Sequence, residues 1–349
     1  MMSFWYMHMP IAGLDIFWPG LVLIGFAVGT IGGFFGMAGA WMVTPGLNIL
    51  GFPMAFAIGT DMAHVAGKAM ISTMRHAKFG NVDYKLGIIM LIGTMVGIEI
   101  GARIVMRLER LGIVGPVVRW IYVFLLALIA IMVFYDYYKV MASRRKKTEL
   151  DPTHLGAGGG INWAPALHKI KIPPMIHLKA AGIYCSAWLP IGISFLTGIL
   201  AGFLGIGGGL FRMPALVYFI GVPTHVAVGT DLFEVMFSGL YGAFTYSLKG
   251  RIELVAVFVM LCGAAIGAQI GTVATKYAKG YAIRLLFGIA VLGCMVSIIL
   301  KQFNIISLST VVLLVDIGGL CLFLIVLMLR GAAAELREKK SNATMAPRS

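Results

Sequence analysis

Arg212 is a charged residue in the middle of a long apolar segment. It is the one charged residue between Cys185 and Val222, and if this segment crosses a bilayer, an unpaired cation there costs at least ~2.5 kcal/mol. Its guanidinium group is a planar fork of donors that suits carboxylate, sulfonate or phosphate oxygens. The sequence leaves two interpretations open: Arg212 binds an anion, or it forms an ion pair with Glu234 or Asp231.

Two Gly-Thr-Asp motifs each open a polar stripe along one face of a helix. The first stripe is net cationic and consists of Asp61, His64, Lys68, Ser72 and Arg75. The second is net acidic and consists of Asp231, Glu234, Ser238 and Thr245. A polar stripe within an otherwise apolar helix should face a water-filled cavity rather than lipid.

The residue types in and beside these stripes could bind an anion and transfer a proton. Lys68 and Arg212 together could neutralise an anionic substrate, while His64 or Glu234 could take up and release a proton near neutral pH. The alternative for His64 and Glu234 is a fixed structural pair. The predicted proton-coupling residues are His64, Glu234, Asp61 and Asp231.

A cluster of glycines, Gly205-Ile206-Gly207-Gly208-Gly209, interrupts the apolar segment just before Arg212. It lacks the Lys-Ser/Thr ending and the strand context of a nucleotide-binding loop. Because glycine in a helix interior costs about 1 kcal/mol relative to alanine, the cluster predicts a break that exposes backbone N–H groups to an anion. The alternative is that these glycines only permit tight helix packing.

The predicted substrate site combines this break with the corresponding segment of the first half. Thr60 and Thr230 of the Gly-Thr-Asp motifs are included, although they or the adjacent aspartates could instead cap a helix or bridge a kink. The predicted substrate-binding residues are Gly36, Met37, Ala38, Gly39, Gly205, Gly207, Gly208, Gly209, Arg212, Lys68, Thr60 and Thr230.

The chain repeats one pattern in its two halves. At an offset of 169 residues, seven Gly, Phe, Pro and Leu positions between Gly29 and Leu47 match those between Gly198 and Leu216. At an offset of 170, ten positions between Gly51 and Gly101 match those between Gly221 and Gly271. Composition bias alone does not keep so many Gly, Pro and Asp residues in register, so the sequence indicates an internal duplication.

Composition places these halves in a membrane. The chain has 349 residues, of which 60% are hydrophobic and 12% charged, and its mean hydropathy is +0.93; soluble domains are about one quarter charged. Gly20 to Asn48 and Leu254 to Thr275 carry no charge, and Pro116 to Tyr135 carries only that of Arg119; each stretch is long enough to cross a bilayer. An ordinary soluble enzyme is excluded, and an all-α polytopic membrane protein is predicted.

The net charge of +14 is interpreted as a topology signal rather than a nucleic-acid surface, because no aromatic stacking platforms accompany the basic residues. The four cysteines have no metal-type spacing and are expected to be small buried hydrophobes. The N-terminal segment lacks the basic start of a removable signal peptide, and its Trp5, Tyr6 and Trp18 suit a membrane interface.

Five regions are predicted: a first transmembrane repeat (1–138), a basic cytoplasmic linker (139–180), a second repeat (181–302), an extra transmembrane helix (303–330) and a cytoplasmic tail (331–349). Within each repeat, a glycine-broken segment is followed by a Gly-x-Pro turn, the Gly-Thr-Asp helix, a helix with glycines at spacing four, and a fourth span. Counting each broken segment as an entering and returning hairpin puts linker and tail on one side and makes the repeats inverted. Counting it as one crossing puts them on opposite sides.

The order Gly-x3-Gly-Phe-x-Gly-x-Gly-Gly-Gly, Pro214, Gly-x-Pro and Gly-Thr-Asp, present in duplicate over about residues 20–302, resembles the sulfite exporter TauE/SafE family of membrane permeases. The resemblance implies a secondary transporter of sulfite, sulfoacetate or related anions in the bacterial inner membrane. The first half departs from the pattern, since Met37-Ala38-Gly39-Ala40 stands where the second half has Ile206-Gly207-Gly208-Gly209. The final span and the long linker are further departures.

The leading hypothesis is therefore a multi-pass transporter of sulfite, an organosulfonate or a related small organic anion, with proton coupling as one option. Its partners are a small anionic substrate and the lipid bilayer, with no nucleic acid, cofactor or metal, and its oligomeric state is not predicted. The alternatives are a passive anion channel and, less favoured, a membrane-embedded enzyme. An enzyme would need a nucleophile–base pair or a metal cluster, and the sequence offers no catalytic residue at usable spacing.

Overall fold

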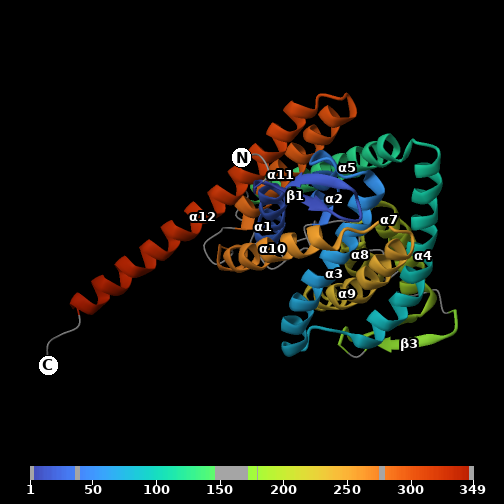
Figure 1. Cartoon of the computed structure of the whole chain (residues 1–349). Coiled ribbons are helices and arrows are strands. Elements are labelled where there is room, and N and C mark those ends of the chain that lie inside the picture. The colour runs from blue at the N-terminus through green and yellow to red at the C-terminus, as the bar shows by residue number, and fades with distance from the viewer. Residues whose placement is uncertain (1–3, 36–39, 146–171, 179, 275–279, 346–349) are drawn as a thin grey trace.

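The computed structural model describes residues 4–35, 40–145, 172–178, 180–274 and 280–345. Most of these residues are in helices (Figure 1). The first half contains β1 (Tyr6–Met9), β2 (Leu14–Phe17), α1 (Trp18–Phe35), the 3₁₀ turn η2 (Ala40–Met42), α2 (Val43–Ile49), α3 (Met54–Lys78), α4 (Tyr84–Arg110) and α5 (Val114–Arg145). The second contains β3 (Met175–Leu178), β4 (Ile183–Ser186), α7 (Trp188–Leu204), α8 (Gly209–Ala215), the π-helical η3 (Leu216–Ile220), α9 (Thr224–Leu248), α10 (Leu254–Ala274) and α11 (Gly280–Gln302). The last helix, α12, spans Ile306–Met345.

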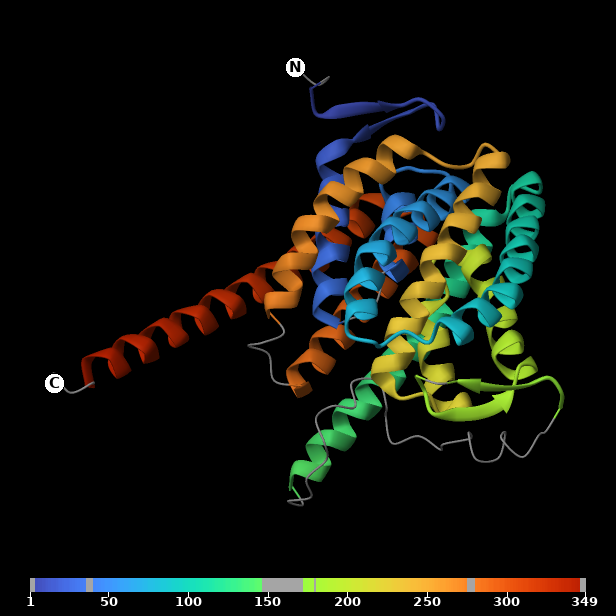
Figure 2. The same ribbon diagram turned by 90° about the horizontal axis from the view of Figure 1, so that it is seen from below.

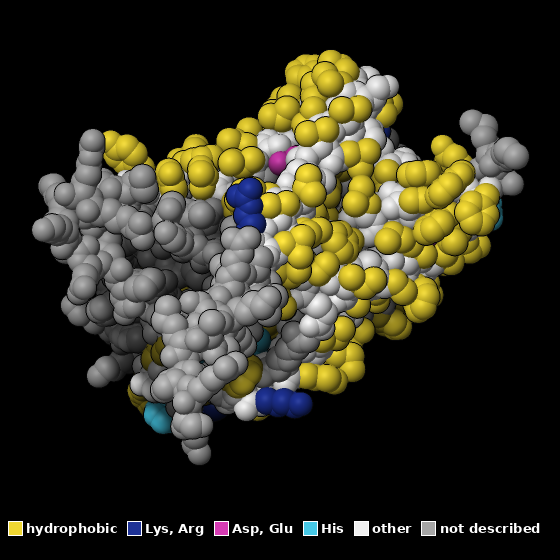
Figure 3. Space-filling view, turned by 90° about the vertical axis from the view of Figure 1, so that its left-hand side faces the viewer, with side chains coloured by type: hydrophobic (Ala, Val, Ile, Leu, Met, Phe, Trp, Pro, Cys, Tyr) yellow, Lys and Arg dark blue, Asp and Glu magenta, His cyan; other side chains and the backbone are white. Residues whose placement is uncertain are grey.

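The predicted all-α polytopic fold is confirmed. Within the residues that the structure describes, four helices are long and apolar enough to cross a membrane: Tyr84–Arg110, Val114–Tyr135, Leu254–Val273 and Ile306–Arg330. Hydrophobic side chains cover much of the described surface in Figure 3, with few charges among them. Such a surface suits lipid, because a bilayer solvates apolar side chains that water would drive inward.

Each half begins with a short antiparallel hairpin, which the sequence analysis did not predict. In the first, Tyr6 pairs with Phe17 and Met9 with Leu14; in the second, Met175 pairs with Ser186. The two hairpins lie at opposite ends of the helical body (Figure 2). These ends are called here the β1–β2 end and the β3–β4 end.

The first broken segment folds back on itself. A Cβ atom at Gly20, in the first turn of α1, would lie 3.2 Å from Cδ2 of Leu50, just past α2. One at Gly46 of α2 would lie 3.0 Å from Cδ1 of Ile24. Therefore α1 enters from the β1–β2 end and α2 returns to it.

Helix pairing joins the two halves. Helix α1 of the first half packs on α10 of the second, and α7 of the second half packs on α4 of the first. The Gly-Thr-Asp helices α3 and α9 also pack on one another. The glycines predicted to allow close approach do so. A Cβ at Gly97 of α4 would lie 2.7 Å from the backbone nitrogen of Ile199, and one at Gly267 of α10 would lie 2.8 Å from that of Thr30.

Observed elements extend across three of the predicted boundaries. Helix α5 continues to Arg145, past the predicted start of the linker at residue 139, and the β3–β4 hairpin begins at Met175, ahead of the predicted start of the second repeat at residue 181. Helix α12 continues to Met345, so the predicted tail is helical through most of its length. Its C-terminal part extends away from the helical body (Figures 1 and 2).

Candidate functional site

The glycine cluster of the second half forms the predicted break. Helix α7 ends at Leu204 and α8 begins at Gly209, and between them Gly205, Gly207 and Gly208 have φ angles of +83°, +65° and +76°. Only glycine adopts this left-handed region without strain, which explains the residue type at all three positions. The predicted residues Gly36, Met37, Ala38 and Gly39 of the first half lie outside the described residues, in the interval between α1 and η2.

The break is packed against the first half of the protein. A Cβ at Gly205 would lie 2.7 Å from Oγ1 of Thr44, and one at Gly207 would lie 2.9 Å from Cγ1 of Val65. The glycines therefore interrupt the helix and also allow close packing, and their anion-binding role stays a prediction.

Arg212 is fully buried in α8 and holds two carboxylates of α9. Its Nε donates to Oδ1 of Asp231 at 2.7 Å, and its Nη2 forms an ion pair with Oε2 of Glu234. Nη2 also donates to the carbonyl of Gly207 at 3.0 Å, and Nη1 donates to Oγ1 of Thr94 on α4 at 3.4 Å. We call these groups the Arg212 cluster. In the conformation described, Arg212 forms ion pairs with both Asp231 and Glu234.

The Arg212 cluster has more negative than positive groups. One guanidinium faces two carboxylates, and Oε1 of Glu234 has no hydrogen-bond partner among the described residues. A buried ion pair is favourable only when its charges and hydrogen bonds are well matched. One additional proton on the carboxylates would balance the charge.

A second polar group occupies the first half, on α3. Oδ2 of Asp61 accepts hydrogen bonds from the backbone nitrogen and Oγ1 of Thr44, at 3.1 and 2.7 Å. Oδ1 of Asp61 lies 4.0 Å from Nδ1 of His64, and both side chains are fully buried. Lys68 donates to the carbonyl of Val28 on α1 at 3.3 Å. We call Thr44, Asp61, His64 and Lys68 the Asp61 cluster.

His64 is the notable member of the Asp61 cluster. Neither of its ring nitrogens has a hydrogen-bond partner within the described part of the chain, and Oδ1 of Asp61 has none either. Buried polar atoms are nearly always hydrogen-bonded, and for these three atoms the described residues supply no partner.

The glycine break between α7 and α8 lies between the two clusters. Gly205 faces Thr44 of the Asp61 cluster, whereas a Cβ at Gly209 would lie 2.6 Å from Oδ2 of Asp231 in the Arg212 cluster. Helices α3 and α9 cross beside it, where a Cβ at Gly239 would lie 3.1 Å from the carbonyl oxygen of Met62. The structure thus places the first residue of each stripe, Asp61 through its partner Thr44 and Asp231 directly, on opposite sides of one break.

Thr60 and Thr230 bind protein backbone in this structure. Oγ1 of Thr60 accepts from the backbone nitrogen of Glu253 at 3.1 Å, and Oγ1 of Thr230 accepts from that of Asp83 at 2.9 Å. Each threonine is buried and holds the residue just before a helix of the other half: Thr60 the residue before α10, and Thr230 the residue before α4. These contacts link helices of the two halves rather than bridging a kink within one helix, and the substrate-binding role of both threonines stays a prediction.

The carboxylates of Asp83 and Glu253 were missed by the sequence analysis. Asp83 accepts from the backbone nitrogens of Leu86 and Ala180, the latter beside the β3–β4 turn, each at 3.1 Å. Glu253 accepts from those of Ile11 and Ala12 in the β1–β2 turn, at 2.9 and 3.0 Å. Their signal was available: an acidic residue recurs three positions after Gly80 and Gly250, at the same offset of 170.

Over the ranges described, no group of three or more His, Cys, Asp or Glu side chains is arranged to hold a metal ion. The described cysteines are not disulfide-bonded: Cys185, Cys294 and Cys321 are buried and Cys262 is exposed.

Duplicated helical halves, broken segments near matching positions and buried charged groups beside the break define the architecture of a polytopic membrane transporter. A family model described as sulfite exporter TauE/SafE matches residues 21–298. The chain belongs to the TauE/SafE family, and it is a multi-pass membrane protein of transporter type.

Curated relatives agree with this assignment. The chain is 26% identical over 259 residues to a probable membrane transporter protein, YunE, of Bacillus subtilis, covering 72% of this chain and 86% of the relative. It is 25% identical over 285 residues to a probable membrane transporter protein of Xylella fastidiosa, covering 80% and 92%. A shorter match, 39% over 72 residues, is to a sulfite exporter TauE/SafE family protein of Arabidopsis thaliana, covering 20% of this chain and 17% of the relative. No solved structure matches the chain.

Proposed function

We propose that the protein is a secondary transporter of sulfite, an organosulfonate such as sulfoacetate, or a related small organic anion across the bacterial inner membrane. The observation that carries this proposal is the fully buried guanidinium of Arg212 at the glycine break. The Asp61 cluster, which includes Lys68, lies on the other side of that break. A planar fork of donors beside a second cation matches the oxygens of a sulfite or sulfonate group.

The partners of Arg212 give the proposal a mechanism. Asp231, Glu234, Gly207 and Thr94 take four of its five N–H donors, so an anion that binds two donors must displace at least one of these partners. A proton on Glu234 would weaken its pairing with Arg212 and release donors for the substrate. Anion and proton would then bind together, and they would cross the membrane in the same direction.

His64 supplies a second candidate for the proton. Its buried imidazole lies next to Asp61 with both ring nitrogens open among the described residues. Histidine changes its charge near neutral pH unless its surroundings shift it, so it suits a proton relay in a water-filled intermediate state.

The proposed transport cycle uses inverted repeats. The supporting observation concerns the two ends of α3. The helix begins after Gly51, where a Cβ would lie 3.8 Å from Cδ1 of Ile16 in the β1–β2 hairpin, and it ends before Asp83, which binds the backbone nitrogen of Ala180 between β3 and β4. A helix of 25 residues is about 37 Å long and thus separates the two hairpins by roughly the thickness of a bilayer. Movement of one half against the other would expose the break alternately at the two ends.

Uptake of radiolabelled sulfite into proteoliposomes tests the charge assignment. We expect Arg212→Gln combined with Glu234→Gln to abolish uptake; the double change avoids leaving two buried carboxylates facing one another. Lys68→Gln should lower uptake strongly. Arg103→Gln, which removes a cation whose side chain is 70% exposed, is the matched control and should transport normally.

Size-exclusion profiles of all variants must show folded protein. Unchanged uptake by both site variants would overturn the assignment of Arg212 and Lys68. Counterflow separates a carrier from the alternative of a channel: unlabelled sulfite on the far side should accelerate entry of the label in a carrier and leave a passive pore unaffected.

A further inference from the structure

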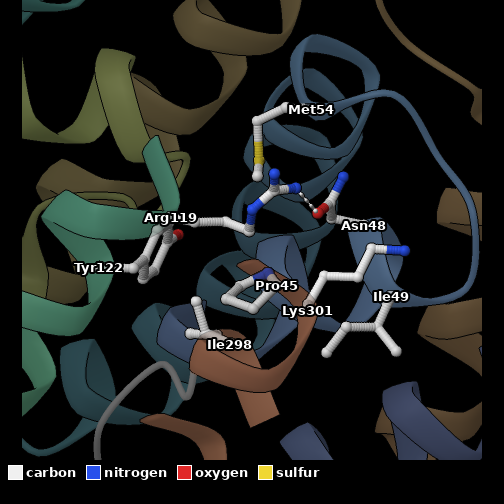
Figure 4. A pocket seen from close by; sticks show the side chains of 8 residues that line it. All are labelled: Pro45, Asn48, Ile49, Met54, Arg119, Tyr122, Ile298 and Lys301. Carbon is white, nitrogen blue, oxygen red and sulfur yellow. Dashed lines mark hydrogen bonds between the residues drawn. The ribbon is translucent and has the colours of Figure 1, made fainter. Parts of the chain in front are cut away.

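A pocket at the β1–β2 end is lined by two cations. It lies between α2, α5 and α11, where Asn48, Arg119 and Lys301 line it together with the apolar side chain of Ile298 (Figure 4). Asn48 is next to the last residue of α2 and Lys301 is next to the last residue of α11. The pocket is therefore close to the membrane surface, at the ends of these helices.

The cations of this pocket are not neutralised by the side chains around them. Arg119 donates from Nε to Oε1 of Gln302 at 2.7 Å and from Nη1 to Oδ1 of Asn48 at 3.2 Å. Both partners are neutral amides, and none of the residues described as lining the pocket is an aspartate or glutamate. Two like charges in a partly dehydrated pocket repel one another, so an anion placed between them would be stabilised.

The inner wall of the pocket contacts the candidate transport site. Tyr122 forms part of this wall, and its hydroxyl donates at 2.5 Å to the carbonyl of Leu204, the residue before the glycine break. Pro45 forms another part, and it directly follows Thr44, which holds Asp61. Thus one layer of side chains separates the pocket from both the break and the Asp61 cluster.

We infer that this pocket is an anion vestibule, a second binding site that receives the oxyanion group of the substrate at the β1–β2 end before or after it passes the break. The inference rests on the proposed function for the substrate class. Arg119 and Lys301 supply the attraction, Asn48 orients Arg119, and Tyr122 with Pro45 forms the closed inner side of the site.

Transport kinetics give the first test. Arg119→Gln and Lys301→Gln should each raise the KM for labelled sulfite at least about fivefold with little change in maximal rate, because they remove binding that does not depend on the transport step. Lys301→Arg should preserve the KM. Arg110→Gln, which removes an exposed charge at the same end outside the pocket, should also leave it unchanged. An unaltered KM in both glutamine variants would overturn the vestibule.

Thiol labelling gives a second test that does not require transport. Ile49, at the pocket wall, is replaced by cysteine in the full chain with Cys262→Ser, and rates are compared for an anionic sulfonatoethyl and a cationic trimethylammonioethyl methanethiosulfonate. The anionic-to-cationic rate ratio should exceed that of a control cysteine at Ile113, in the α4–α5 turn at the same end, by at least about fivefold. Arg119→Gln with Lys301→Gln should abolish this preference, and methanesulfonate should slow the anionic reaction.

The same assay identifies a lipid headgroup as the alternative source of an oxyanion. Nanodiscs of phosphatidylcholine alone are compared with nanodiscs containing phosphatidylglycerol. Blocking by phosphatidylglycerol with no effect of methanesulfonate would overturn the vestibule and assign both cations to lipid phosphate. Failure of the unaltered protein to carry sulfite, with the labelling preference intact, would count against the proposed substrate but support the anion pocket.

Discussion

Arg212 and Glu234 are two side chains whose ion pair competes with the proposed substrate. In the conformation described, Glu234 faces Arg212 and receives a hydrogen bond from Ser238 at 3.3 Å; Asp231 binds the same guanidinium. Deprotonated Glu234 therefore opposes anion binding, and protonated Glu234 favours it. It follows that uptake in the unaltered protein should rise as the solution becomes more acidic.

The variant Glu234→Gln tests this competition. Glutamine has nearly the same shape as a protonated glutamate, so the variant should bind anions as the protonated protein does at every pH. We expect uptake of labelled sulfite that hardly changes between mildly acidic and mildly alkaline buffers, with no accompanying acidification of the vesicle interior. Glu109→Gln, in the partly exposed pair with Arg251, is the control. A pH profile like that of the parent would assign the coupling proton to another group.

Thr60 allows a structural role to be separated from a ligand role. Thr60→Val keeps the shape of the side chain but leaves the backbone nitrogen of Glu253 without its acceptor. A buried donor left unpaired costs about 1–3 kcal/mol, so the variant should lower the unfolding free energy by that amount, and Thr60→Ser should restore it. Chemical denaturation in detergent measures both. Normal stability combined with loss of transport would instead favour Thr60 as a substrate ligand.

At the level of elements, the sequence predicts those parts of the fold whose backbone conformation requires a particular residue type. Gly205, Gly207 and Gly208 indicated the break because their backbone needs a positive φ angle. The partners of Thr60 and Thr230 were not predictable, because they belong to the opposite half and depend on how the halves pack. The same holds for Arg212, where sequence alone could not choose between an anion and the carboxylates of α9. The two hairpins were missed because four-residue strands carry little periodicity.

The paired helices α4 and α7 make a testable prediction at this level. A Cβ at Gly97 would approach the backbone atoms of Ile199 and Gly198 at 2.7 and 2.8 Å, and backbone on a packed helix has little room to move. Gly97→Ala should therefore destabilise the protein by about 1–3 kcal/mol or more. Gly192→Ala, on α7, meets nothing within 4 Å and should be neutral or stabilising by up to about 1 kcal/mol.

Thermal unfolding of the two variants in the same detergent measures the contrast. Equal melting temperatures for Gly97→Ala and Gly192→Ala would show that α4 and α7 do not pack with their backbones in contact.

For the whole molecule, the arrangement of the halves determines which residues face each side of the membrane. The first half starts from the β1–β2 end and the second from the β3–β4 end (Figure 2). Each hairpin is held by an acidic residue of the opposite half, Glu253 or Asp83. Each end of the helical body is therefore held by hydrogen bonds between the two halves.

Single cysteines in the two hairpins test the inverted arrangement directly. Ile11→Cys in the β1–β2 turn and Tyr184→Cys in β4 replace side chains that are 46% and 58% exposed, in a Cys262→Ser background. With a membrane-impermeant maleimide, Ile11→Cys should be labelled from one side of oriented membrane vesicles and Tyr184→Cys from the other. By the hairpin count, the β3–β4 side should also be the side of the basic linker, which positive charge retains in the cytoplasm. Labelling of both cysteines from the same side would contradict inverted repeats and, with them, the proposal that the break opens alternately to the two ends.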